Sequence, residues 1–268
     1  MKAIGSLGYL PDFGDSRDIE FKPKLRLLKA TPPVFDLRKE FIIPFRFDQG
    51  SLGSCTGNMG SMAVYIENLR SGLASPKHVS RLALYYGARL LMGTTHYDSG
   101  AYIRNIFKDL NKSGCADELL WPYKITKFKV KPDKNYYTNA ELQQAIKYER
   151  VNQTLATIKA CLLEKTPICL GFSVYSNLGN ASIDGFVDMP QGSLEGGHAV
   201  VIAGWTNDLK LVSKNKPPSF TKKFKEWFIC INSWGKKWGD GGDFYIPVEY
   251  LLNPNLATDF WRLIKLEK

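Results

Sequence analysis

The hydrophobic pattern changes near residue 165, and this change constrains the fold of the chain more than any other feature. Before it, apolar residues recur at helical spacing in five segments, of which the fourth has weaker limits: 55–72, 78–93, 101–114, 142–146 and 155–165. After it come four short β-prone runs separated by Gly, Pro and Asn: 167–175, 198–205, 226–234 and 243–251. Helices followed by strands favour an α+β fold with one helical and one β-rich lobe over an alternating parallel sheet.

The size and composition are those of a globular protein. With 268 residues the chain can form one large domain or two lobes around a cleft, and 44% apolar residues exclude wholesale disorder. No apolar run approaches the roughly 20 residues that span a bilayer, so we expect no membrane segment. The first residues, MKAIGSLGYLPDFGDSRD, meet Gly, Pro and Asp early and do not resemble a signal peptide. We expect synthesis in the cytosol, and export by a route without a signal peptide stays open.

The net charge of +10 comes partly from lysines gathered at 124–134 and 210–225. Both segments are rich in Pro, Asn or Ser, which is typical of exposed loops. Basic surfaces attract phosphate, but no recognisable nucleic-acid-binding module accompanies the charge. We interpret the lysines as a solvated face and expect no nucleic-acid partner.

The five cysteines give no sign of a metal site, because no pair has the CxxC spacing of zinc ligands. We expect neither a metal nor an organic cofactor. Without a signal peptide the default is free thiols, although a bridge between Cys161 and Cys169 stays open.

Cys55 differs from a structural cysteine because it follows the small and polar turn GSLGS, which leaves room for an approaching group. If a helix begins just after it, the helix dipole favours the thiolate, and a nearby base would complete an activated nucleophile. The chain has three histidines. His78 lies in a helical pattern and His96 in a turn, so both are interpreted as structural. His198 follows two glycines at the start of a strand and could project into a cleft.

Four sequence pieces in this order resemble the papain-like cysteine proteases: Gln49, the GSLGSC turn, GGHAVVIAGW and INSWGKKWGDGGDFYI. The pieces around His198 are most similar to the cathepsin B branch. FDLR at 35–38 and WPY at 121–123 also resemble family members, so the similarity covers nearly all of the chain after residue 34. His198 follows Cys55 by 143 residues, within the roughly 130–150 expected in this family.

The resemblance implies a role for each of these residues. Cys55 would attack a peptide carbonyl to form a thioester acyl-enzyme, and His198 would serve as general acid and base. Asn232 would orient His198, as the third member of a triad does. Gln49 would donate its side-chain amide to the oxyanion. Taken singly, Gln49 could be a solvated turn residue and Asn232 an ordinary residue at a strand end.

Further residues take supporting roles by the same resemblance. Trp234 would shield the His198–Asn232 hydrogen bond from water with Trp238 stacked nearby, unless both are ordinary core aromatics. The residues expected to bind substrate are Ser99, Gly100, Gly197, Asp259 and Ala257.

The resemblance also implies a residue near the C-terminus as the floor of the main (S2) pocket. Alignment of NPNLATDFW gives Asp259 there, with Ala257 as the other candidate. An acid at this floor would accept an Arg or Lys side chain as well as apolar ones. Alternatively, Asp259 turns to solvent or caps a turn.

The chain departs from the family pattern at four places, one of which is Ser99 in the usual glycine pair, where a serine can still present its N–H and C=O to substrate. Leu52 stands where members have a cysteine paired in a disulfide, and Thr56 replaces the usual tryptophan after the nucleophile. The long helical propeptide is missing, and only residues 1–34 precede FDLR as an extension or short pro-segment. We hypothesise that the arm Tyr9–Phe21 restrains activity.

The sequence is therefore interpreted as a papain-like cysteine endopeptidase over residues 35–268, with a helical lobe at about 35–145 and a β lobe at about 146–268. We expect a monomer that acts on proteins or peptides and could meet proteinaceous cysteine-protease inhibitors. We see no histidine-bearing loop of the kind that makes cathepsin B a dipeptide-trimming enzyme. Two alternatives stay open: a peptide ligase or transpeptidase with the same triad, and a catalytically silent basic binding scaffold.

Overall fold

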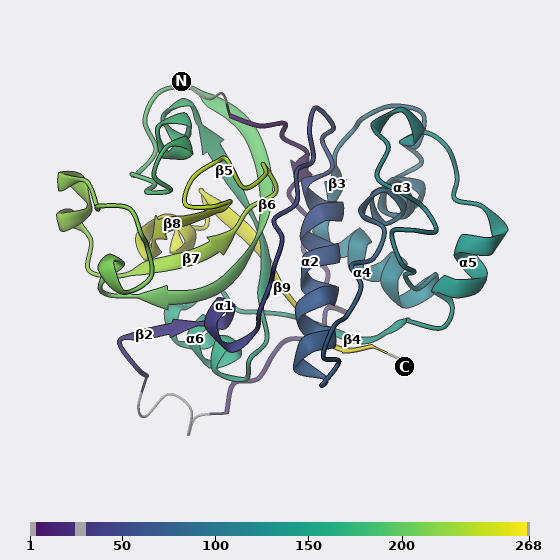
Figure 1. Ribbon diagram of the computed structural model, residues 1–268, viewed down its shortest axis with the longest axis horizontal. Coiled ribbons are helices and arrows are strands. Elements are labelled where there is room, and N and C mark those ends of the chain that lie inside the picture. Colours follow the sequence, from purple (N-terminus) through teal and green to yellow (C-terminus); the bar gives the residue numbers. More distant parts are fainter. Residues whose placement is uncertain (1–3, 25–30, 267–268) are drawn as a thin grey trace.

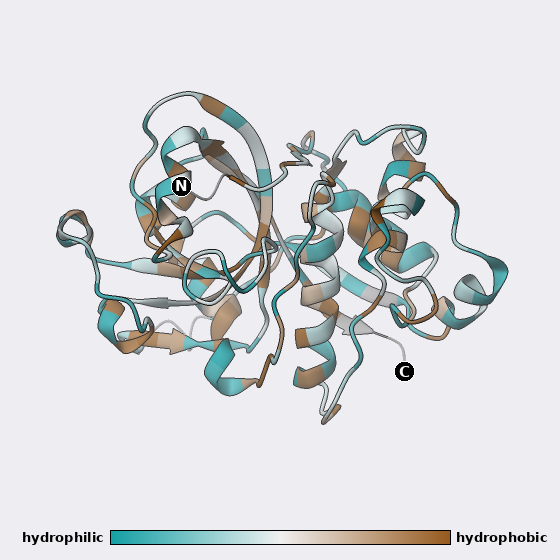
Figure 2. Cartoon of the chain, turned by 45° about the horizontal axis from the view of Figure 1, so that its top comes forward, coloured by the Kyte–Doolittle hydropathy of each residue, from teal (hydrophilic) through white to brown (hydrophobic). Residues whose placement is uncertain are grey.

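The computed structural model describes residues 4–24 and 31–266, which form two lobes side by side (Figure 1). One lobe is built from helices and the other from an antiparallel sheet, so the α+β fold expected from the sequence is confirmed. Helix α2 (Cys55–Arg70) stands at the junction, and all of its residues from Cys55 to Asn68 are buried. A helix buried all round needs mostly apolar or small residues, and the buried polar residues of α2 are hydrogen-bonded, as Asn58 is to Ser54 and Glu67 to Arg70. Figure 2 shows apolar residues (brown) along α2 and β6 (Leu194–Thr206), where the lobes meet.

The helical lobe packs two longer helices against α2. α3 (Arg81–Met92) begins where the Ser80 side chain accepts a hydrogen bond from the amide of Ala83, and it ends at Gly93 with φ 72°. A two-residue strand, β3 (Ala101–Tyr102), leads into α4 (Ile103–Lys112). α5 (Lys134–Ala140) completes the lobe and is capped by the Asp133 carboxylate.

The β lobe is a seven-stranded antiparallel sheet in the order β4-β9-β5-β6-β7-β8, with β2 added on β6. Its strands not yet given are β2 (Val34–Asp36), β4 (Ala145–Arg150), β5 (Ile168–Tyr175), β7 (Trp227–Ile231), β8 (Asp243–Pro247) and β9 (Ala257–Leu266). Three short helices accompany it: α1 (Leu37–Glu40), α6 (Leu155–Leu163) and α7 (Val248–Leu252). β6 pairs with β7 only from Val201 onward, so its Gly196–Ala199 end has one edge free of the sheet.

The helix predictions for 55–72, 78–93, 101–114 and 155–165 are confirmed by α2, α3, α4 and α6. The helix predicted at 142–146 is wrong. The helix of this region is α5, which begins earlier, after the N-cap residue Asp133. Ala145 is instead the first residue of β4, which pairs with β9. The run 243–251 is a strand only up to Pro247, where α7 begins. Within the described ranges no helix is both long and apolar enough to cross a bilayer.

An N-terminal arm, defined here as residues 4–24, runs between the two lobes (purple in Figure 1). Its strand β1 (Tyr9–Leu10) pairs in parallel with β3, so that Tyr9 lies opposite Ala101. Farther along, the amide of Phe21 donates to the carbonyl of Arg150, 2.8 Å away. The arm is thus fixed to the helical lobe at β3 and to the sheet at the end of β4.

Candidate active site

Cys55 is the first residue of α2 and is completely buried. The side chain of the N-cap residue Ser54 accepts no hydrogen bond from a backbone amide of the first turn, so these amides remain available to a negative group at this point. The backbone amides of Ala199 and Gly8 face the thiol as hydrogen-bond donors. Ala199 follows His198 on β6, and the fold therefore brings the cysteine and this histidine together from opposite lobes.

His198 is held in one orientation by its neighbours. Its Nε2 lies 2.7 Å from Asn232 Oδ1, which also accepts the amide of Ser233 at 2.8 Å. Because the Asn232 oxygen is an acceptor, Nε2 carries the proton and Nδ1 keeps its lone pair. Within the described part of the chain Nδ1 has no hydrogen-bond partner. Trp234 stacks on the ring at 4.3 Å between centroids.

Gln49 is buried and locked by three hydrogen bonds. Its Oε1 accepts from Ser233 Oγ at 2.7 Å, which fixes which end of the amide is the donor. Its Nε2 donates to the carbonyl of Leu52 at 2.9 Å and to that of Ser6 in the arm at 3.0 Å. The amide NH₂ therefore points at the place where the arm crosses the site.

The arm fills the space beside Cys55, between the two lobes. The amide of Gly8 donates to the carbonyl of Gly197 at 3.1 Å, and the carbonyl of Gly8 accepts from the amide of Ala101 at 2.8 Å. A Cβ added at Gly8 would lie only 1.8 Å from the carbonyl oxygen of Gly53, so no other residue fits there without movement. The main chain at Gly8 thus bridges both walls of the cleft.

Tyr9 occupies a pocket whose floor is Asp259. Its hydroxyl donates to Asp259 Oδ2 at 2.6 Å, and its ring lies against Gly171. The same carboxylate accepts the amide of Asp12 at 2.7 Å and pairs through Oδ1 with Arg150 at 2.9 Å. Burial and the Asp259 charge raise the pKa of Tyr9, so the phenol stays protonated and acts as the donor.

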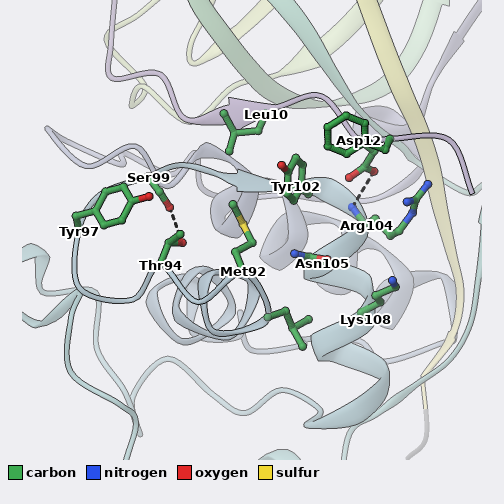
Figure 3. A pocket seen from close by; sticks show the side chains of 12 residues that line it. Leu10, Asp12, Met92, Thr94, Tyr97, Ser99, Tyr102, Arg104, Asn105 and Lys108 are labelled. Atoms are coloured by element: carbon green, nitrogen blue, oxygen red, sulfur yellow. Dashed lines mark hydrogen bonds between the residues drawn. The ribbon is translucent and has the colours of Figure 1, made fainter.

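A further pocket of about 540 Å³ lies where the arm leaves the cleft (Figure 3). Leu10 and Asp12 of the arm form one wall, and Tyr102 and Arg104 from β3 and α4 form another. The amide of Arg104 donates to Asp12 Oδ2 at 3.2 Å. The arm is therefore held beyond Tyr9 as well.

Burial sets the ionisation of Cys55 and His198 while the arm is in place. It raises the pKa of the Cys55 thiol to about 12, against which the surrounding amides act only partly. It lowers the pKa of His198 to about 4, opposed by the hydrogen bond to Asn232. In this closed form the cysteine is a neutral thiol and the histidine a neutral imidazole.

The structure brings together most of the residues that the sequence singled out. Trp238 packs edge-on against Trp234 at 4.9 Å between centroids. Gly100 and Gly197 flank Gly8 and have no space for a Cβ beside the arm.

Two other substrate-binding candidates lie differently. Ser99 lines the pocket where the arm leaves the cleft, and its hydroxyl contacts Thr94 Oγ1 and the carbonyl of Gly100, each at 2.8 Å. Ala257 is buried, and its carbonyl accepts a hydrogen bond from Gln153. At the floor of the pocket, Asp259 is the residue that bonds to the arm, through Tyr9.

The two remaining histidines lie outside this site. The ring of His78 packs against Phe45 and Phe47, and that of His96 against Tyr97. Among the described residues no cluster of His, Cys, Asp and Glu could hold a metal ion, and all five cysteines are free.

Sequence reasoning missed Ser233 and Asp98. Ser233 holds Gln49, and Asp98 holds the amide of Gly53 two residues before Cys55. Ser233 lies within the piece INSWGKKWGDGGDFYI but was given no role there, and Asp98 lies outside the quoted pieces; each acts through a contact with a residue far along the chain.

The chain is similar to known cysteine proteases in sequence and in fold. The family model described as papain family cysteine protease matches residues 31–253. An uncharacterized peptidase C1-like protein of Acanthamoeba polyphaga mimivirus is 34% identical over 282 residues, covering 96% of this chain and 86% of that protein. The cathepsin B-like protein CP2 of Giardia intestinalis is 26% identical over 223 residues, covering 80% of this chain and 68% of that protein. Xylellain, a cysteine protease from Xylella fastidiosa, has a solved structure with a TM-score of 0.85 and 34% identity, covering 98% of this chain and 97% of that one.

Proposed function

Because the chain belongs to the papain family of cysteine proteases, which hydrolyse peptide bonds, we propose that it is an endopeptidase with Cys55 as nucleophile and His198 as general acid and base. The observation that carries this proposal is the orientation of His198. Asn232 holds Nε2 at 2.7 Å, and Nδ1, which has no hydrogen-bond partner within residues 4–24 and 31–266, is left for the thiol at the start of α2. A nucleophile, a base and a group that orients the base are thereby supplied by three different elements.

The proposed reaction begins when the arm leaves and a substrate peptide takes its place. Water and the helix end then favour transfer of the Cys55 proton to Nδ1 of His198, giving a thiolate beside an imidazolium. The thiolate attacks the substrate carbonyl carbon, and the imidazolium gives its proton to the departing amine. A water molecule, deprotonated by His198, then attacks the thioester and releases the acid and the free thiol.

Gln49 is proposed to stabilise the oxyanion together with the backbone amide of Cys55. Its Nε2 already donates to a peptide carbonyl, that of Ser6, at 3.0 Å. Ser233 keeps the NH₂ end pointed in this direction without any need for rearrangement during the reaction. A donor of this kind typically contributes a factor of about 10²–10³ to the rate.

The N-terminal arm is proposed to be inhibitory, as the short pro-segment or arm of a domain that starts near residue 35. It contacts Gln49, the thiol of Cys55 and the Asp259 pocket, and these three residues are all buried beneath it. No substrate can reach Cys55 while the arm stays in place. The full chain would therefore be active only in proportion to the time that the arm is open.

Endopeptidase action is favoured over dipeptide trimming. A trimming enzyme needs a group that blocks one end of the cleft and binds a substrate terminus. His78 and His96 lie away from the site, where their rings pack against other aromatic side chains. The cleft is closed by the N-terminal arm instead.

The S2 pocket is proposed to take tyrosine in addition to the basic and apolar side chains that an acidic floor allows. Tyr9 places a phenol on Asp259, whose other oxygen is paired with Arg150 at 2.9 Å. Because Arg150 already balances the carboxylate, a second cation gains less there than a neutral donor does. Comparing Tyr, Arg and Leu at this substrate position, with Asp259→Ala alongside, tests the assignment.

Hydrolysis of internally quenched peptides by the full chain tests the proposed function. We expect turnover that disappears in Cys55→Ala and in His198→Ala, with products cut inside the peptide. A ligase would instead give products carrying an added amine. Folded protein that leaves every peptide intact, even when the arm is loosened, would contradict a protease.

A further inference from the structure

The segment 48–54, here called the oxyanion loop, leads into α2 and is bonded to Arg81, the first residue of α3. Nη1 of Arg81 donates to the carbonyl of Asp48 at 3.2 Å and to Asn58 Oδ1 at 3.0 Å. Asn58 in turn donates through Nδ2 to the carbonyl of Ser54 at 2.9 Å. One nitrogen of Arg81 is therefore linked to both ends of the oxyanion loop.

The side chain of Arg81 is itself held in one orientation. Its Nε and Nη2 donate to the two carboxylate oxygens of Glu118 at 2.9 and 2.8 Å. Its guanidinium carbon lies 4.3 Å from the ring centroid of Phe47 and 4.1 Å from that of Tyr123. The side chains of Arg81 and Glu118 are only 10% and 13% exposed, so water competes little with these bonds. A planar guanidinium bound through two parallel N–H bonds leaves Nη1 pointing in a fixed direction, toward the loop.

Gln49 lies in the loop between two such attachments. The carbonyl of Asp48, which precedes it, is bound by Arg81, and its own carbonyl accepts the hydroxyl of Tyr123 at 2.9 Å. At the end of the side chain, Oε1 accepts from Ser233 at 2.7 Å. The backbone on both sides of Gln49 and the tip of its side chain are thus fixed, which leaves its Nε2 in one place.

We propose that Arg81, held by Glu118, is a positioning residue that fixes the oxyanion loop so that Gln49 Nε2 lies where the oxyanion forms. The inference rests on the proposed protease function and extends it to a residue that acts through Gln49. An oxyanion donor is effective because it is in place before the reaction and does not have to move during it. Misplacing a reacting or stabilising group by about 1 Å can lower the rate about 100-fold.

Arg81→Lys separates the two contacts of this side chain. Lysine keeps a positive charge for Glu118, so no carboxylate is left without a cation beneath the loop. Its ammonium is not a planar fork and cannot bind Glu118 and the carbonyl of Asp48 in the same geometry. We expect kcat to fall about tenfold, with KM unchanged within about twofold, because the lost contact affects the oxyanion rather than the bound substrate.

Arg70→Lys is the matched control because Arg70 makes the same kinds of contact elsewhere. Its Nε and Nη2 donate to the two carboxylate oxygens of Glu67, each at 2.6 Å, and Nη2 also donates to the carbonyl of Ile264 at 2.6 Å. Arg70 is the last residue of α2, about 22 Å along the helix from Cys55. Its kcat should equal that of the parent.

The test uses the full chain with Gly8→Ala, in which the arm is loosened, and an internally quenched peptide. Arg81→Lys and Gln49→Ala are measured alone and combined. Because both changes act on the same donor, Arg81→Lys should lower kcat by less than about twofold once Gln49 is replaced. The rate of Cys55 alkylation by an epoxide inhibitor should also stay within about twofold of the parent, since this reaction forms no tetrahedral adduct at a carbonyl.

Three results would overturn the inference: a folded Arg81→Lys with the parent's kcat, an equal fall with and without Gln49, or alkylation slowed as much as hydrolysis. The second and third would mark Arg81 as a residue that supports only the fold. If Arg81→Lys does not fold, Arg81→Met combined with Glu118→Gln removes both charges together and is judged by the same three results.

If no peptide is cleaved by any variant, the proposed function fails instead. The inference is then decided by the NMR signals of the Gln49 side-chain amide, identified by their loss in Gln49→Ala. We expect them to shift or broaden in Arg81→Lys and to stay unchanged in Arg70→Lys. Signals that are unchanged in both variants would overturn the inference.

Discussion

Replacing Gly8 by alanine should open the cleft without touching any catalytic residue. The added Cβ would meet the carbonyl oxygen of Gly53 at 1.8 Å and its carbonyl carbon at 2.4 Å. These are backbone atoms just before α2 and cannot move aside, and Gly8 has no positive φ that would itself penalise alanine. The arm must therefore withdraw.

Overpacking of this kind costs roughly 1–3 kcal/mol, and the cost falls on the closed form alone. If the open form is a small minority in the parent protein, its population should rise about 5- to 150-fold. Peptide hydrolysis measured at low substrate concentration should increase by the same factor, up to the limit set by a fully open arm.

Gly14→Ala is the matched control, because a Cβ there meets nothing within 4 Å although Gly14 belongs to the same arm. Its activity should equal that of the parent. If Gly8→Ala folds normally, as judged by circular dichroism, and hydrolyses peptides no faster than Gly14→Ala, the arm does not control access to Cys55.

Three further predictions use the same assay or the arm itself. In the Gly8→Ala background, Gln49→Ala should lower kcat about 10²–10³-fold with little change in KM, because the donor acts on the oxyanion; a KM effect alone would assign Gln49 to substrate binding. Tyr9→Phe leaves a buried Asp259 oxygen with one hydrogen-bond donor fewer, which should destabilise the closed form by about 1–3 kcal/mol. The rate of peptide hydrolysis should therefore rise at least about fivefold. An unchanged rate would show that the phenol does not hold the arm. The pH response should depend on Asp12. Burial and the charge of Asp259 raise the pKa of Asp12 to about 7, and burial lowers that of His198 to about 4. Between these values protonation of Asp12 stabilises the closed arm and protonation of His198 favours the open one, so the parent should respond weakly to pH. Asp12→Asn should leave an arm that opens as the pH falls, measured by hydrogen exchange at residues 7–10 after correction for the intrinsic rate; an arm that closes in acid would contradict the assignment.

That Cys55, His198, Asn232 and Gln49 lie together could be predicted from the sequence, because each of them belongs to a short local pattern. Cys55 follows a turn of small residues and starts a helix, and His198 follows two glycines in a strand. Their order and spacing were enough to bring them together. Of the departures from the family pattern, Leu52 is buried in the core and Thr56 is buried beside Cys55 in the first turn of α2.

The path of the arm could not be predicted in the same way. β1 has only two residues and pairs with a two-residue strand, which leaves no periodic pattern to recognise. What fixes the arm is a close approach at Gly8 and one buried hydroxyl at Tyr9, and both depend on residues more than 40 positions away. The contacts of Asp98 could not be predicted from the sequence either, since they are hydrogen bonds with Gly53 and Tyr85, which lie elsewhere in the chain.

The wrong helix at 142–146 has a related cause. Over so short a segment, the spacing of apolar residues fits a strand as well as a helix and cannot distinguish the two. The choice is made by β9, which pairs with residues 145–150 from the far end of the chain. Similarly, the pattern of 243–251 gave no sign that Pro247 ends a strand and begins α7.

The most direct test of the central claim is the reaction of Cys55 with an epoxide-type cysteine-protease inhibitor, followed by intact mass and peptide mapping. Parent, Gly8→Ala, and Gly8→Ala combined with Cys55→Ala or His198→Ala are compared. A single adduct at Cys55 that forms faster in Gly8→Ala than in the parent and requires His198 is the predicted result. No adduct on folded Gly8→Ala, or an adduct that forms equally fast without His198, would contradict an activated Cys55–His198 pair closed by the arm.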